Sequence, residues 1–135
     1  MVSVMKRLMV MGVAVLLAVG CTSAQARDVR KTIPSGKAQL LDFFTSLNPN
    51  CSVAGETQVR VSSQPRKGDL IIRNGSGVTS YPRSNQRYAC NERYVRGVEV
   101  FYRSYGGYFG PDSLSIEVFF PDGEASPSTY YIQVR

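Results

Sequence analysis

The feature that most constrains the fold is an alternation of apolar and polar side chains near the C-terminus. Apolar residues recur at every second position from Leu114 to Phe120 and again from Tyr130 to Val134. A period of two places one face of an extended strand in a core. Pro121-Asp122-Gly123 lies between the two segments and has the residue types of a tight turn. The sequence therefore predicts an antiparallel hairpin that closes a β-sandwich.

Shorter patterns of the same kind occur upstream. We expect further strands over residues 37–44, 57–63, 69–73 and 98–103. Pro65-Arg66-Lys67-Gly68 is expected to form a hairpin turn. Residues 74–77 are expected to be flexible and residues 88–90 to be strand-like, whereas residues 27–36 are expected to form an N-terminal arm or a first edge. Seven to eight short strands with turn signals about every ten residues are typical of an all-β sandwich.

Two sequence blocks resemble a known family. They are P-R-K-G-D-L-I-I at 65–72 and G-Y-F-G-P-D-S-L-S-I-E-V at 107–118, followed by the P-D-G turn. This pattern is similar to bacterial immunoglobulin-like and cadherin-like repeats and covers residues 57–135. The resemblance implies an immunoglobulin-like antiparallel β-sandwich over residues 37–135, in a family with mostly structural, adhesive or interaction roles.

The chain also departs from that family. Arg66-Lys67 stands where the repeats usually have a histidine before the glycine, and Cys90 lies in an insertion. The repeats usually occur in tandem, whereas this chain carries one. Asp112, Asp122 and Glu124 do not form the calcium-ligand run of true cadherins. We therefore transfer the fold from the resemblance and no functional residue.

The N-terminal residues predict export. Lys6 and Arg7 precede an apolar run at residues 8–19, and small residues follow. This order is typical of a signal peptide, and the run is short for a permanent membrane span. Ala24-Gln25-Ala26 predicts a signal peptide over residues 1–26 and a mature chain that begins at Arg27. The alternative is a lipoprotein signal over residues 1–20, since residues 18–21 resemble a lipobox that would lipidate Cys21.

The cysteine content agrees with an oxidising compartment. Removal or lipidation of Cys21 leaves Cys51 and Cys90, which we expect to form a disulfide in the periplasm or outside the cell. An outer-membrane lipoprotein is the alternative location. The chain has no histidine, and the cysteines lack C-x-x-C spacing, so the sequence predicts no metal site and no cofactor.

The mature chain is basic. Of 16 Lys and Arg, two lie in the predicted signal peptide, which leaves 14 against 10 Asp and Glu. Because nucleic acid is a poor partner for an exported domain, we expect another envelope or periplasmic protein, with an anionic polysaccharide as the alternative. Contact with a membrane is expected only if Cys21 is lipidated. The positive charge is also compatible with a role in solubility alone.

The inventory of catalytic residues is small. Without histidine, a Ser-His-Asp triad is impossible. Asp112 is expected to bind backbone amides of its own turn. Glu92, Glu99 and Glu117 are scattered and are expected to lie on solvated faces, with Glu99 and Glu117 in the outward phase of their strands. We therefore predict no enzymatic activity.

Tyrosine and arginine are concentrated in residues 81–108. These two residue types are enriched in interface hot spots, and the segment holds six of the eight tyrosines. The other interpretation is that these tyrosines cap the ends of the sandwich, with arginine stems across them. The candidate contact residues are Tyr81, Arg83, Arg87, Tyr88, Arg93, Tyr94, Arg96, Arg103, Tyr105 and Tyr108.

These observations predict a non-enzymatic binding or accessory subunit of a bacterial envelope assembly that engages a partner protein through this Tyr/Arg-rich segment. A carbohydrate- or peptidoglycan-binding module is the second hypothesis, because exposed tyrosines also serve as stacking platforms. An enzyme of unrecognised type is the third. The exposure of the aromatic rings discriminates between the first two hypotheses.

Overall fold

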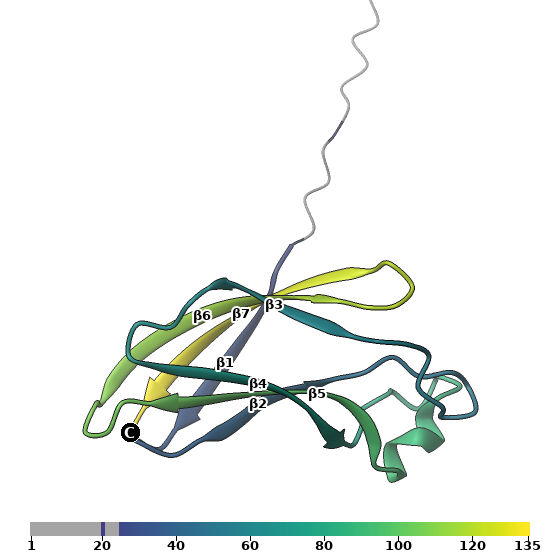
Figure 1. Cartoon of the computed structure of the whole chain (residues 1–135), viewed down its shortest axis with the longest axis horizontal. Helices are drawn as coiled ribbons and strands as arrows, with labels where there is room; N and C mark the ends of the chain where they lie inside the picture. Colours follow the sequence, from purple (N-terminus) through teal and green to yellow (C-terminus); the bar gives the residue numbers. More distant parts are fainter. Residues whose placement is uncertain (1–19, 21–24) are drawn as a thin grey trace, which may run out of the picture.

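A computed structural model describes residue 20 and residues 25–135. Most of the predicted signal peptide, including the possible lipidation residue Cys21, lies outside the described residues. Within them, seven strands form two sheets that pack face to face (Figure 1). The elements are β1 Arg27–Ile33, β2 Gln39–Phe44, β3 Gln58–Ser63, β4 Gly68–Gly77, the 3-10 helix η1 Tyr88–Glu92, β5 Val95–Ser104, β6 Gly110–Phe119 and β7 Ala125–Val134.

The strand order is that of an immunoglobulin-like sandwich. One sheet has the order β1-β7-β6-β3 and the other the order β2-β5-β4. The last three strands of the first sheet correspond to G, F and C of an immunoglobulin domain, and the second sheet corresponds to B, E and D. The first strand joins the sheet of the last strand, where β1 runs parallel to β7, whereas the other strand pairs are antiparallel. The predicted all-β sandwich is confirmed.

The core lies between the two sheets and follows the predicted alternation. Every second residue of β6 and β7 is buried, from Leu114 to Val118 and from Tyr130 to Val134. Val100 and Tyr102 of β5 face them from the other sheet. Because the side-chain period of a strand is two, this pattern also fixes the register of the closing hairpin.

The predicted turn joins β6 to β7. Gly123 has a φ of 90°, which favours glycine, and its N–H donates to the carbonyl of Phe120 at 3.0 Å. The N–H of Phe120 donates in return to the carbonyl of Glu124 at 2.9 Å. The antiparallel hairpin predicted from Pro121-Asp122-Gly123 is therefore confirmed.

The expected hairpin at residues 65–68 is wrong. β3 pairs with β6 and β4 pairs with β5, so this segment crosses from one sheet to the other. The backbone amides of Arg66 and Lys67 donate to the carboxylate of Asp112, which holds the crossing segment against β6. A proline-glycine turn signal marks a change of direction, but it does not specify which strands then pair.

Two further expectations fail for local reasons. Residues 74–77 are the ordered end of β4, where Gly75 pairs with Gly97. Side chains lie over these glycines: a Cβ on Gly75 would meet Glu99 at 2.4 Å, and one on Gly77 would meet the Phe43 ring at 2.8 Å. Residues 88–90 belong to η1 instead of a strand, and the amides of Tyr88 and Cys90 donate to carbonyls three residues earlier.

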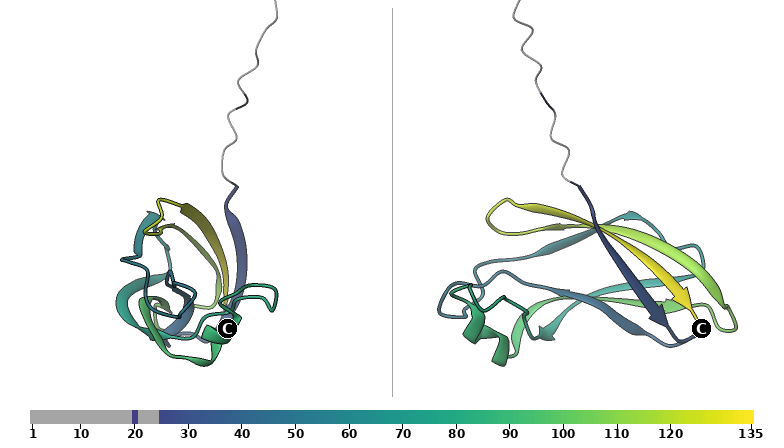
Figure 2. Two further views of the ribbon diagram at one scale, coloured as in Figure 1. Left: turned by 90° about the vertical axis from the view of Figure 1, so that its right-hand side faces the viewer. Right: turned by 180° about the vertical axis from the view of Figure 1, so that it is seen from behind.

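The N-terminal segment is part of the sandwich. The sequence predicts an arm or a first edge over residues 27–36, and β1 forms an edge of the four-stranded sheet in register with β7. The two views of Figure 2 show β1 lying along β7. Among the described residues, no helix is long and apolar enough to cross a membrane.

Candidate functional site

β5 divides the predicted Tyr/Arg segment between opposite ends of the sandwich. Its ten residues, at about 3.4 Å each, separate the two groups by roughly 30 Å. The predicted single contact surface is therefore two surfaces. One group lies at the end that carries η1, and the other lies in and beside the β5–β6 turn (Figure 1). The first group is Tyr81, Arg83, Arg87, Tyr88, Arg93, Tyr94 and Arg96; the second is Arg103, Tyr105 and Tyr108.

The η1 end comprises the loop at residues 45–57, the segment at residues 78–94 and the start of β5. It has a small core of its own: Leu47, Cys90 and Val95 are buried, and Phe43 packs against them. The left view of Figure 2 looks onto this end of the molecule. The predicted disulfide between Cys51 and Cys90 is confirmed, and it joins the two segments across 39 residues of sequence.

Asparagine side chains fix the path of residues 78–91. Asn91 accepts bonds from the Thr79 hydroxyl and the Tyr81 amide, both at 2.9 Å, and donates to the Tyr81 carbonyl. Asn85 accepts from the Arg87 amide at 2.8 Å. Asparagine favours turns because its side chain satisfies nearby backbone groups. A long segment without strands is thereby held in one conformation.

Two of the predicted contact residues serve this scaffold. Arg87 is half-buried, and its Nε donates to the carbonyl of buried Leu47 at 2.6 Å. Tyr81 is half-buried against the small core. The interpretation that tyrosines pack under loops therefore applies to Tyr81, and Arg87 likewise makes a structural contact.

Tyr94 is the most exposed aromatic residue of this end. Its exposed fraction is 81%, whereas that of Tyr88 is 44%. The Arg83 guanidinium lies over the Tyr88 ring, 5.9 Å from its centroid. Arg93 and Arg96 are exposed next to Tyr94 in the sequence. Residues 81–96 carry four arginines and one acid, Glu92, so exposed aromatic area and positive charge occur together here.

Sequence reasoning missed two apolar residues of the η1 end. Val53 and Val78 are 44% and 51% exposed. Val53 lies in the loop that the disulfide holds, and Val78 directly follows β4. Neither residue stands in an alternating pattern. The position of Val53 could have been predicted from the Cys51–Cys90 disulfide, because this bond places the loop at residues 45–57 beside η1.

The opposite end is organised around Asp112. Its carboxylate accepts from the backbone amides of Arg66 and Lys67 at 3.1 and 3.0 Å, and from Ser113 at 2.9 Å. The hydroxyl of buried Tyr102 donates to it at 2.8 Å. Asp112 thus accepts from only one local amide, that of the next residue in β6, and its other two backbone donors lie in the segment that connects the sheets. The aspartate of the G-Y-x-G-x-D-S block therefore has a structural role.

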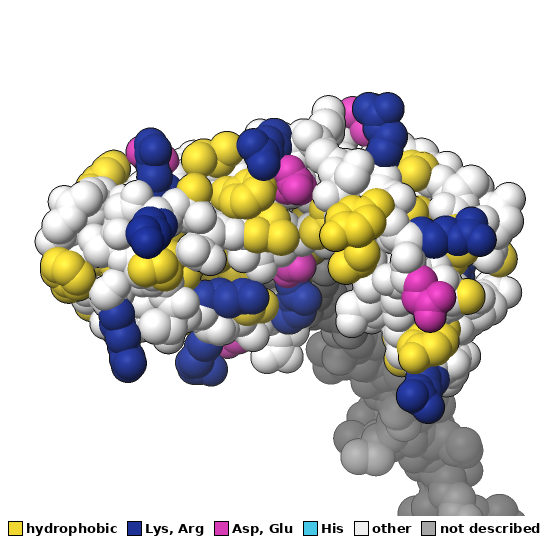
Figure 3. Space-filling view, turned by 90° about the horizontal axis from the view of Figure 1, so that it is seen from below, with side chains coloured by type: hydrophobic (Ala, Val, Ile, Leu, Met, Phe, Trp, Pro, Cys, Tyr) yellow, Lys and Arg dark blue, Asp and Glu magenta, His cyan; other side chains and the backbone are white. Residues whose placement is uncertain are grey.

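The tyrosines of this end differ in exposure. Tyr108 is half-buried, its hydroxyl donates to the Pro111 carbonyl at 2.5 Å, and Lys67 lies over its ring. Tyr105 and Phe109 are 50% and 67% exposed. Arg103 is exposed on β5. Figure 3, which views the side of β2, β4 and β5, shows Lys and Arg side chains spread over the face among hydrophobic patches.

The carboxylates considered for catalysis lie on separate elements. Glu92 is in η1, Glu99 on β5 and Glu117 on β6 in the other sheet. Glu99 is half-buried and bound to Arg73 of β4, with an Nε–Oε2 distance of 2.9 Å. In the described part of the chain, no three Asp, Glu, Cys or His residues group together to hold a metal ion.

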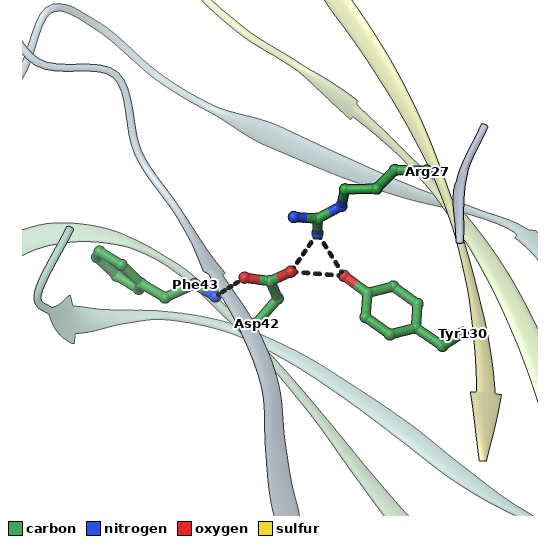
Figure 4. A network of polar contacts seen from close by, with 4 residues as sticks. All are labelled: Arg27, Asp42, Phe43 and Tyr130. Atoms are coloured by element: carbon green, nitrogen blue, oxygen red, sulfur yellow. Dashed lines mark hydrogen bonds and ion pairs between the residues drawn. The ribbon is translucent and has the colours of Figure 1, made fainter. Parts of the chain in front are cut away.

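A polar network that the sequence did not reveal joins three strands (Figure 4). Asp42 of β2 accepts from the Arg27 guanidinium of β1 and from the Tyr130 hydroxyl of β7, the latter at 2.9 Å. The Phe43 amide donates to its other oxygen at 3.1 Å. Burial raises the pKa of Tyr130, and the charge of Asp42 raises it further. The network ties the N-terminal strand to both sheets beside a groove of about 630 Å³.

Comparison with known proteins gives no assignment: neither a scan against family models nor searches of curated proteins and solved structures found a match to this chain.

Proposed function

We propose that this chain is a non-enzymatic, exported binding or accessory subunit of a bacterial envelope assembly that engages a partner protein through its η1 end. The contact residues would be Tyr88, Arg93, Tyr94 and Arg96. The observation that carries the proposal is the 81% exposure of Tyr94 on a disulfide-linked scaffold with exposed arginines on both sides.

The rigidity of the scaffold supports this role. An exposed tyrosine binds well when little conformational freedom is lost on contact. The Asn91 bonds and the Cys51–Cys90 disulfide restrict the backbone that precedes Tyr94, and β5 begins at the next residue, Val95. Loops on a rigid sandwich are also where binding residues collect. The geometry therefore favours preorganised recognition.

The compartment is part of the same proposal. A disulfide supports an oxidising location, which fits the signal-peptide pattern at residues 1–26. The basic η1 end would attract an acidic partner, and rim charges of this kind chiefly accelerate encounter.

The arrangement of the rings favours a protein over a carbohydrate. A sugar stacks on an open aromatic face, and a row of coplanar rings suits a polysaccharide. Here the Arg83 guanidinium lies over the Tyr88 ring, and Tyr81 packs into the small core, which leaves Tyr94 as the ring with the greatest exposure at this end. A single open ring with exposed arginines near it in the sequence better suits a mixed apolar and acidic protein surface.

The test is capture from native envelope extract with the immobilised mature protein. Tyr94→Ala should lose the retained partner, whereas Tyr105→Ala, a matched change at the opposite end, should keep it. Circular dichroism checks that both variants fold. Loss with Tyr105→Ala and retention with Tyr94→Ala would place the contact at the other end. Elution of the domain from a peptidoglycan or polysaccharide column by free sugar would support the carbohydrate hypothesis instead.

A further inference from the structure

β4 is an edge strand with an open outer side. It pairs with β5 over all ten of its residues without a register shift, and the described part of the chain places no strand on its other side. The edge strands β2 and β3 both contain register shifts. Natural edge strands are usually protected from pairing by bulges, prolines or lysines. β4 has none of these between Asp69 and Gly77.

The hydrogen-bonding pattern identifies which backbone groups face outward. The Lys67 carbonyl accepts from the amide of Tyr105, which lies directly opposite, at 2.9 Å. Lys67 and Tyr105 are therefore a hydrogen-bonded pair, and such pairs alternate along an antiparallel ladder. Odd-numbered residues of β4 direct their N–H and C=O groups toward β5. The corresponding groups of Gly68, Leu70, Ile72 and Asn74 point to the open edge.

The inward side chains of β4 are incompletely covered. Val100 and Tyr102 of β5 are fully buried, whereas Leu70 and Ile72, their neighbours on β4, are only half-buried. Both residues pack against the main core. Because β4 is the edge of its sheet, a strand added there would cover apolar surface of these residues as well as supply backbone partners.

The sequence of this edge is complementary to itself. Residues 69–73 read D-L-I-I-R, with an acid at one end, a base at the other and apolar residues between them. We propose that β4 pairs with β4 of a second copy of this chain, antiparallel and with the two-fold axis through Ile71. Asp69 then lies opposite Arg73 of the partner, and Ile71 lies opposite the partner's Ile71.

The register agrees with the direction of the free backbone groups. An axis through Ile71 makes Leu70 and Ile72 of the two copies opposite partners, and Gly68 and Asn74 likewise. These residues are the ones whose N–H and C=O groups face the edge, so each becomes half of a hydrogen-bonded pair. The Asp69–Arg73 pair falls at a non-hydrogen-bonded position, where side chains approach most closely.

The charged groups are available for this contact. Arg73 uses Nε for Glu99, which leaves its terminal amino groups for a second carboxylate, and its side chain is 62% exposed. Its guanidinium lies 4.6 Å from the centroid of the Phe101 ring, which holds it on the outer face of the sheet. Asp69 is exposed and has no ion pair within the described residues.

The resulting dimer joins two three-stranded sheets into one continuous sheet and closes by two-fold symmetry. Self-association is favoured over capture of an unrelated peptide because both charges and the apolar centre find their complements in a second copy. Each subunit supplies the same patch, as an isologous interface requires.

A proline scan tests the backbone contact. Sedimentation velocity of the mature protein should show a dimer that dissociates on dilution. The Asn74 amide faces the open edge, so Asn74→Pro should leave the β5 ladder intact and raise the dimer dissociation constant at least tenfold. Gly75→Pro removes an amide that faces β5 and should instead destabilise the monomer. Circular dichroism and thermal melts distinguish the two effects.

Charge reversal tests the register. Asp69→Arg alone and Arg73→Glu alone should each be monomeric, because each places like charges opposite one another. An equimolar mixture of the two variants should recover a heterodimer in which both pairs are attractive. Arg30→Glu, a reversal on the edge strand of the other sheet, should leave the wild-type dimer unchanged.

Several outcomes would overturn the proposal. A wild-type protein that stays monomeric at its highest soluble concentration would exclude the dimer. A dimer that persists in Asn74→Pro and Asp69→Arg would place the interface elsewhere. If monomeric wild type instead binds an added β4 peptide or another extended peptide, and Asn74→Pro abolishes that binding, the edge would serve a foreign strand.

Discussion

The hydroxyl of Tyr102 donates a hydrogen bond of 2.8 Å to the carboxylate of Asp112, across the interface between the two sheets. Tyr102 lies in the middle of its sheet and is fully buried, and Asp112 lies near the start of β6. The same carboxylate holds the segment that crosses from β3 to β4. One side chain therefore links both sheets and their connection, which gives the G-Y-x-G-x-D-S block a role in stability.

Replacement of Asp112 should destabilise the protein strongly. Asp112→Ala leaves the buried Tyr102 hydroxyl and the loop amides without their acceptor, and we expect a loss of about 2 to 3 kcal/mol of unfolding free energy. Urea denaturation measures this loss. Asp28→Ala, at an exposed position of β1, is the control and should change stability by less than about 0.5 kcal/mol. Equal stability of the two variants would contradict the role assigned to Asp112.

Alkaline pH should unfold the protein through Tyr102 and Tyr130. Burial raises the pKa of both hydroxyls, and the carboxylates of Asp112 and Asp42 raise it further. An unfolded tyrosine ionises near pH 10, whereas these two remain protonated in the folded state, so the unfolded state binds fewer protons above that pH. Their contribution to stability is thus present below pH 10 and decreases above it.

The measurement is urea denaturation at pH 8, 9, 10, 11 and 11.5. The wild type should lose stability above about pH 10, and the double variant Tyr102→Phe, Tyr130→Phe should lose less over the same interval. Tyr94→Phe, which changes an exposed ring, is the control and should follow the wild type. Parallel curves for all three proteins would show that neither buried tyrosine governs the alkaline transition.

The disulfide should stabilise the η1 end more than the sheets. The chain-entropy model gives roughly 3 to 4 kcal/mol for a loop of this length. Cys51 also has a φ of 70°, a conformation that non-glycine residues rarely adopt and that the bonded loop maintains. After Cys51→Ser, Cys90→Ser, hydrogen exchange should accelerate at residues 45–57 and 78–94, while the β6 and β7 amides stay protected. Uniform acceleration over all strands would indicate that the bond stabilises the whole sandwich.

The alternation of side chains predicted the fold well, whereas short-range signals predicted the connections poorly. Leu114, Ile116 and Val118 have a period of two, and a strand buried on one face requires that period. The pairing of β3 with β6 is not encoded locally. The partner residues lie far apart in the chain, and Asp112 of β6 binds the amides of residues 66 and 67, which are more than 40 positions away in sequence.

The candidate site was predictable in composition but not in layout. The high content of tyrosine and arginine identified residues 81–108 as a candidate site. The ten-residue strand β5 runs through this segment and places its two halves at opposite ends of the sandwich. Nothing in the local sequence distinguishes Arg87 from Arg93 as a structural or an exposed residue. In the structure, Arg87 bonds to the Leu47 carbonyl 40 residues away, whereas Arg93 is exposed. The Asp42 network was missed for a similar reason, because its partners come from β1, β2 and β7.

Processing should leave Arg27 as the first residue. The A-x-A site precedes it, and its guanidinium then binds Asp42 from the start of β1. Intact-mass measurement of exported protein should give a chain of residues 27–135, and Cys21→Ser should not alter that mass. A lipid-modified chain that begins at Cys21 in the wild type would establish the lipoprotein alternative.

Arg87 and Arg93 provide a matched test of structural and contact roles at the η1 end. Arg87→Ala removes the donor to the carbonyl of buried Leu47 and should lower the unfolding free energy by about 1 to 3 kcal/mol. Arg93→Ala changes an exposed side chain and should alter stability by less than about 0.5 kcal/mol.

At low salt, Arg93→Ala should slow association with the captured partner, because exposed charges accelerate encounter. Urea denaturation and the salt dependence of the association rate measure the two effects. If Arg87→Ala proves as stable as Arg93→Ala, the bond to Leu47 does not support the loop, and Arg87 would return to the set of candidate contact residues.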